Sequence, residues 1–85
     1  MATARNKARN KRSLTIARHR TSVSLEQPFW DALTEIARDQ GKSIAELVGE
    51  IDQERTERGD GTSLSAALRL YVLARMKDAR KQQTS

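Results

Sequence analysis

Polar and apolar residues alternate strictly over residues 20–25, where the chain reads RTSVSL. A period of two in a short segment rich in β-branched residues predicts a β-strand. Because successive side chains of a strand point to opposite faces, this strand has one apolar and one polar face. The apolar face carries Thr21, Val23 and Leu25, and the polar face carries Arg20, Ser22 and Ser24.

Alternation also occurs upstream, at Leu14 and Ile16, which allows an extended segment over residues 13–17. These two apolar residues have even numbers, whereas those of the 20–25 strand have odd numbers. A continuous strand would therefore need a bulge or a turn near residues 17–19.

Helical spacing of apolar residues, together with helix-boundary signals, predicts three helices after the strand. Pro28 suits the first turn of a helix, and Gly41 suits its C-terminal end. Ser43 and Glu46 form an S-x-x-E capping box for the second helix, and a turn cluster at 59–63 precedes the third. The predicted helices span residues 28–40, 43–58 and 63–81, and residues 82–85 form a tail.

The third helix is apolar nearly all round. One stripe consists of Leu64, Leu68, Tyr71, Val72 and Met76. Leu70 and Leu73 lie on the far side, and a helix of this kind is buried on more than one face. Two explanations stay open: packing on a second subunit as well as on its own domain, or a groove for a partner peptide.

The 20–25 strand has no predicted partner in residues 20–85, so its edges must be paired by another chain. We expect two copies to form an antiparallel ribbon across a two-fold axis. The predicted fold class is therefore mostly α, an intertwined homodimer with an intermolecular two-stranded sheet and a third, C-terminal helix. The dimer core is predicted to consist of Thr21, Val23, Leu25, Phe29, Trp30, Leu33, Ile36, Leu47, Val48 and Ile51.

Charge is distributed unevenly along this chain of 85 residues and formal net charge +5. Residues 1–20 contain seven basic residues and no acid, whereas residues 21–85 contain nine basic and eleven acidic residues. Residues 1–12 are predicted to be a disordered basic arm, and residues 13–81 the folded domain. The arm is interpreted as a polyanion-binding segment, with a solubilising tail and an organelle transit peptide as alternatives.

Composition excludes several classes of protein. The chain has no Cys and one His, which excludes a disulfide framework and a Cys/His zinc site. It contains no apolar run that could span a membrane or serve as a signal peptide, so we expect a soluble intracellular protein. The absence of a Cys nucleophile, a metal-ligand cluster and a Gly-rich phosphate loop argues against an enzyme and against a cofactor.

The string R-T-S-x-x-L-E-x-x-F-W at residues 20–30, with LSAALR at 64–69, resembles the ribbon-helix-helix family of bacterial DNA-binding proteins. The likeness covers about residues 13–76 and is closest to a branch with an added C-terminal helix. It implies a dimer whose ribbon enters the major groove of DNA. By position, the base-contacting residues are Arg20, Ser22 and Ser24, and the start of the second helix, at Lys42, Ser43 and the amide of Ile44, holds a phosphate.

Arginine can pair with guanine through two hydrogen bonds, whereas serine hydroxyls discriminate poorly among bases. Arg20 is therefore expected to carry most of the readout, and cations on phosphates to add affinity without sequence preference. The remaining predicted phosphate contacts are Arg5, Lys7, Arg9, Lys11, Arg12, Arg18 and His19.

Several residues have more than one interpretation. His19 is a groove contact, a simple exposed residue or a pH switch. Trp30 belongs to the core or dimer interface, or is a stacking platform for bases. Arg69 either extends to solvent or pairs with an acid such as Glu26. The acids of the second helix form a solvated face or a site for a basic partner: Glu46, Glu50, Asp52, Glu54 and Glu57.

These observations predict a bacterial transcriptional regulator that binds double-stranded DNA in the cytoplasm, at the nucleoid. The main alternative is an antitoxin-like or adaptor dimer whose C-terminal helix holds a partner protein, with DNA binding secondary. A third interpretation is an RNA-binding protein that uses the arm alone.

Overall fold

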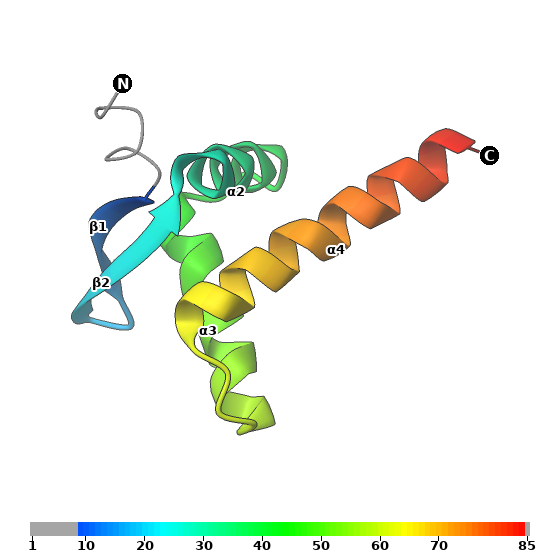
Figure 1. The fold of residues 1–85 in the computed structure, drawn as a ribbon. Coiled ribbons are helices and arrows are strands. Elements are labelled where there is room, and N and C mark those ends of the chain that lie inside the picture. The colour runs from blue at the N-terminus through cyan, green and yellow to red at the C-terminus, as the bar shows by residue number, and fades with distance from the viewer. Residues whose placement is uncertain (1–8, 85) are drawn as a thin grey trace.

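The computed structural model describes residues 9–84, which form a β-hairpin followed by three helices (Figure 1). The fold class predicted from the sequence is confirmed in its elements, a β-ribbon, two helices and an added C-terminal helix. The elements are β1 (Arg9–Ile16), β2 (His19–Glu26), α2 (Gln27–Asp39), α3 (Ile44–Arg58) and α4 (Leu64–Thr84).

The two strands pair antiparallel within one chain, so the expectation of a purely intermolecular sheet is wrong. A two-residue turn at Ala17 and Arg18 joins them, with φ of 52° and 71°. Two successive positive φ values characterise the type I′ turn, whose twist suits a hairpin. Pairing of Ile16 with His19 sets even-numbered residues of β1 opposite odd-numbered residues of β2. The parity change that the sequence shows near residue 17 is therefore a hairpin turn.

The predicted disordered arm is also partly wrong, because residues 9–12 belong to β1. These residues are polar, so their composition does not indicate a strand. They form one because they pair with β2, from Arg9 opposite Glu26 to Arg12 opposite Val23. Residues 1–8, which make up the rest of the predicted arm, lie outside the described residues. At the other end, the predicted tail is helical as far as Thr84, in α4.

Three helix boundaries lie at residues that favour them, one in α2 and two in α3. Pro28 lies in the first turn of α2. At α3, the Ser43 hydroxyl accepts from the Glu46 amide at 3.0 Å, and the Glu46 carboxylate accepts from the Ser43 amide at 2.8 Å, so the predicted capping box is present. Gly59 ends α3 in the left-handed conformation, at φ 64°.

The core lies between the inner face of the hairpin and the three helices. Of the predicted core residues, Thr21, Phe29 and Ile36 are half-buried at its margin. At Gly49 of α3, an added Cβ would lie 3.4 Å from Cγ2 of Ile16, so the missing side chain lets β1 approach α3 closely. The buried core residues are Ile16, Val23, Leu25, Trp30, Leu33, Ala37, Leu47, Val48, Ile51, Ala67, Leu68 and Val72.

Helix α4 is anchored at its start and free at its end. Arg69 binds Glu26 through Nε and Oε1 at 3.0 Å, which settles the two interpretations of Arg69 in favour of an ion pair. Beyond Val72, which is 4% exposed, the helix extends away from the hairpin and α3 (Figure 1). Met76, predicted to share the buried stripe of Leu68 and Val72, is 55% exposed because it lies on this projecting part. No helix within residues 9–84 is long and apolar enough to cross a membrane.

Candidate nucleic-acid interface

The polar face of the hairpin brings together side chains from both strands. The register sets Lys11 opposite Ser24, Ser13 opposite Ser22 and Thr15 opposite Arg20. Cross-strand partners point to the same face of an antiparallel pair, and the opposite face carries the buried Val23 and Leu25, so these side chains point away from the core. We call this surface the hairpin outer face: Lys11, Ser13, Thr15, Arg20, Ser22 and Ser24.

The three residues predicted to contact bases, Arg20, Ser22 and Ser24, thus lie together, and all but the half-buried Ser24 are exposed. The prediction missed Ser13 and Thr15 and assigned Lys11 to a flexible arm. The signal for them was present in residues 13–16, where polar residues at odd positions alternate with apolar residues at even ones. It was misjudged because the second strand was not expected within the same chain.

The tip of the hairpin adds further positive charge. Arg18 occupies the turn and is exposed, and His19 next to it is exposed as well. By register His19 lies opposite Ile16, on the side of the hairpin away from Arg20. Because residues 9–25 contain no acid, the field over the outer face and the tip is positive.

Arg12 does not lie on the outer face. It is half-buried on the inner side of β1, opposite Val23, and its guanidinium carbon is 4.7 Å from the centroid of the Trp30 ring. This stacking is a cation–π contact. Arg12 also lines a cleft with Arg38 of α2 and Lys42, so three cations meet where β1, α2 and the start of α3 converge.

The start of α3 is less available to an anion than expected. The Lys42 ammonium is bound to the Glu50 carboxylate, with Nζ 2.6 Å from Oε1. The Ser43 hydroxyl and amide are both used in the capping box, and Glu46 places a carboxylate at the helix N-terminus. An acid in this position competes with a phosphate for the same positive end of the helix dipole.

Trp30 is fully buried, and its Nε1 donates to the main-chain oxygen of Asn10 at 2.8 Å. It is therefore a core residue and no stacking platform for bases.

The acids of α3 lie on a solvated face, where Glu46, Glu50, Glu54 and Glu57 are exposed.

Of the remaining predicted phosphate contacts, Arg9 opens β1, while Arg5 and Lys7 lie outside the described residues. Within residues 9–84, no group of three His, Asp or Glu side chains could hold a metal ion.

Comparison with known proteins identifies the architecture. The family model of the ribbon-helix-helix domain matches residues 9–76, a region that begins with β1 and so includes both strands of the hairpin. A solved structure, that of an uncharacterized protein from Bordetella pertussis Tohama I, is 32% identical in sequence and superimposes with a TM-score of 0.73. The match covers 92% of this chain and 64% of the other, so this chain spans less than two thirds of that protein. No curated protein matches the chain.

Proposed function

This chain belongs to the ribbon-helix-helix domain family, and from that premise we propose that it binds double-stranded DNA as a homodimer, with the hairpin outer face in the major groove. The observation that carries the proposal is the composition of that face. It presents two cations, four hydroxyls and no acid on a two-stranded ribbon. A ribbon of this width fits the major groove, which is about 12 Å wide.

The side chains of the hairpin outer face differ in how well they discriminate among DNA bases: one discriminates strongly and several weakly. Arg20 can bind guanine O6 and N7 together, whereas Ser13, Ser22 and Ser24 can donate to or accept from any base. The Thr15 methyl adds a surface for the methyl group of thymine. We therefore expect a short preferred sequence centred on a guanine, with tolerance at the flanking positions.

The length of the face limits how much DNA one hairpin can read. Lys11 and Thr15 stand at its two ends, four residues apart, which corresponds to about 13 Å of strand. DNA rises about 3.4 Å per base pair. Each hairpin therefore covers about four base pairs, and a longer operator requires the second hairpin of a dimer.

Phosphate contacts would flank this reading surface. Arg18 and His19 at the tip would contact one backbone, and the basic residues Arg5, Lys7 and Arg9 of the N-terminal segment would follow the other. The cleft of Arg12, Arg38 and Lys42 is a further anion contact if Lys42 leaves Glu50. Such contacts raise affinity for all sequences and make it fall with salt. The proposed role is that of a bacterial transcriptional regulator at the nucleoid, acting without a cofactor.

The test is a fluorescence-anisotropy titration of full-length protein on random and genomic duplexes at several salt concentrations. Arg20→Ala is expected to cost about 1–3 kcal/mol on a preferred site and to reduce discrimination at one base position. Lys11→Ala is expected to weaken all sequences and to lower the salt slope by about 1. Arg58→Ala, which removes an exposed cation on α3, serves as the matched control and should change neither quantity.

Equal weakening on every sequence with Arg20→Ala would contradict base readout by the outer face. Loss of binding on deletion of residues 1–8, with Arg20→Ala silent, would instead favour an RNA-binding or purely electrostatic arm.

One observation favours a second candidate, an antitoxin-like adaptor that holds a partner protein on its C-terminal helix. Leu70, Leu73 and Met76 of α4 are 57%, 50% and 55% exposed in the single chain. Contiguous apolar side chains of this kind mark an interaction surface.

A further inference from the structure

Apolar packing along the inner side of β1 ends before the strand does. Ile16 is buried and Leu14 is half-buried on this side. The next two inward positions, Arg12 and Asn10, are polar, although they lie opposite the buried residues of β2. A strand end without apolar contacts frays, because its hydrogen bonds open easily to solvent. The end of β1 that carries Lys11 therefore needs polar contacts to stay paired with β2.

Asn10 makes such contacts through both its side chain and its main chain. Its Nδ2 donates to Oε1 of Gln27, the first residue of α2. Its main-chain oxygen accepts from Nε1 of Trp30 at 2.8 Å. The Gln27 amide is held in turn, since its Nε2 donates to Oδ1 of Asp31 at 2.8 Å. We call the two bonds of Asn10, to Gln27 and to Trp30, the Asn10 anchor.

The next inward residue of β1 is attached to the same helix. The guanidinium carbon of Arg12 lies 4.7 Å from the centroid of the Trp30 ring. Positions 10 and 12 are thus both bound to α2, and Lys11 lies between them. Because side chains alternate along a strand, attaching its two neighbours to α2 directs Lys11 to the hairpin outer face.

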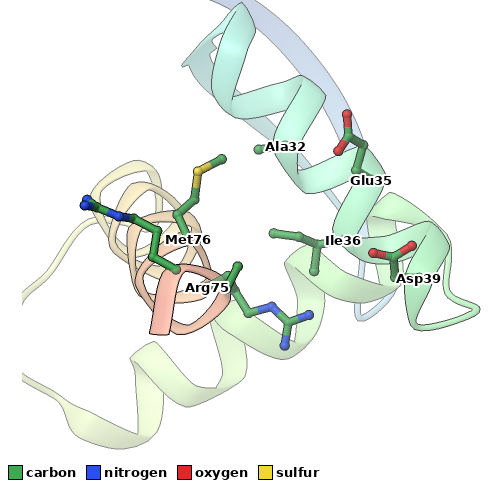
Figure 2. A pocket seen from close by; sticks show the side chains of 8 residues that line it. Ala32, Glu35, Ile36, Asp39, Arg75 and Met76 are labelled. Carbon is green, nitrogen blue, oxygen red and sulfur yellow. The ribbon is translucent and has the colours of Figure 1, made fainter. Parts of the chain in front are cut away.

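Helix α2 is a firm support for the Asn10 anchor. Leu33 and Ala37 of this helix are buried in the core. Elsewhere on α2, Ala32 and Ile36 face Met76 of α4 across a pocket (Figure 2), and no residue of the Asn10 anchor lines that pocket. Groups held by a packed helix are oriented more precisely than groups held by a loop.

We propose that Asn10 is a positioning residue, which holds Lys11 on the hairpin outer face for contact with DNA. The DNA contact itself rests on the proposed function. Without the Asn10 anchor, Lys11 would have to be ordered at the moment of binding, and part of its contribution to affinity would be lost to that ordering. With the anchor, Lys11 is already in place in the free protein.

The test is a double-mutant cycle in DNA binding, measured by fluorescence anisotropy on the full-length protein at several salt concentrations. Lys11→Ala is expected to lower the salt slope by about 1. Asn10→Ala removes no charge, yet it should weaken binding to every duplex by about threefold or more and lower the salt slope in the same direction. The double variant should lose less affinity than the two single losses combined, because the anchor acts through Lys11.

The salt slope separates positioning from a purely structural role. Loss of stability alone would leave the slope unchanged, since no contact between a cation and a phosphate would be lost. Gln27→Met removes the acceptor of the side-chain bond and should reproduce Asn10→Ala. Gln53→Ala is the matched control, because it removes an exposed amide that donates to Glu57 of α3 at 3.3 Å, and it should change neither affinity nor slope.

Amide hydrogen exchange of the free protein measures the Asn10 anchor without DNA. In Asn10→Ala, the amides of residues 10–12 should exchange faster, because the end of β1 opens more often. Those of α2 and α3 should keep their wild-type rates, which shows that the variant is folded. Gln27→Met keeps the test valid if Asn10→Ala fails to fold.

A wild-type salt slope in Asn10→Ala, together with wild-type exchange at residues 10–12, would overturn the proposal. Losses in the double variant equal to the two single losses combined would overturn it as well. The proposed function fails differently, when the wild type binds no duplex or when Arg20→Ala weakens all sequences equally. A wild type that binds no duplex would overturn the DNA contact of Lys11 too, whereas equal weakening by Arg20→Ala would not affect the cycle of Asn10 and Lys11.

Discussion

Trp30 of α2 donates a hydrogen bond from Nε1 to the main-chain oxygen of Asn10 in β1, at 2.8 Å. The two residues are far apart in sequence, and the bond connects the first strand to the first helix. On the same ring lies the Arg12 guanidinium, 4.7 Å from the centroid. Trp30 is fully buried. Its side chain therefore connects β1, which was not predicted as a strand over residues 9–12, to the predicted core.

Trp30→Phe should therefore destabilise the protein by about 2–4 kcal/mol, through the lost hydrogen bond and the cavity left by the smaller ring. Urea unfolding followed by circular dichroism measures this change. The destabilisation should be accompanied by faster amide hydrogen exchange in β1. Unchanged exchange in β1 would mean that the strand is held by contacts other than Trp30.

The hairpin turn holds two residues in a conformation that they disfavour, since Ala17 and Arg18 both have positive φ. The double substitution Ala17→Asn with Arg18→Gly introduces the Asn-Gly pair that this turn type favours, and it should stabilise the fold by about 1 kcal/mol or more. Thermal unfolding measures this gain. If β2 paired only with the strand of a second copy, the turn would not constrain the sheet and the substitution would leave the unfolding temperature unchanged.

The Arg69–Glu26 ion pair connects α4 to the end of β2, with Nε–Oε1 at 3.0 Å and Nη2–Oε2 at 3.3 Å. Both side chains are about one third exposed, so solvent screens the pair and its coupling energy should be about 0.5–1 kcal/mol. A double-mutant cycle with Arg69→Met and Glu26→Gln measures this coupling energy, because the contributions of the other contacts of Glu26 cancel in the cycle. A coupling near zero would show that α4 is anchored by apolar packing alone.

The turn before α4 contains a carboxylate that favours its ionised form. Hydrogen bonds from the side chain and the amide of Thr62, and then the charge of Arg58, lower the pKa of Asp60 from its usual value. A depressed folded-state pKa adds stability above the pKa of the unfolded chain, and this contribution is lost as pH falls through the folded pKa. In an NMR titration, Thr62→Val should raise the pKa of Asp60. An unchanged pKa would assign the shift to the Thr62 amide and Arg58, which the substitution leaves in place.

Local signals in the sequence determined most of the elements. Pro28, the Ser43–Glu46 capping box and Gly59 mark helix boundaries through backbone chemistry that acts over a few residues, and the observed helices begin or end there. The alternation over residues 20–25 likewise determined the polar face on which Arg20, Ser22 and Ser24 lie together.

Tertiary structure alone decided the partner of that strand. Residues 9–12 carry too little apolar surface to indicate a strand by themselves, and they form β1 because β2 supplies their hydrogen bonds and Trp30 binds Asn10. Tertiary structure likewise decided three other features: the position of Arg12 on the Trp30 ring, the pairing of Lys42 with Glu50 and the exposure of Met76. Each depends on which elements the fold brings together, whereas periodicity in the sequence describes only the faces of a single element.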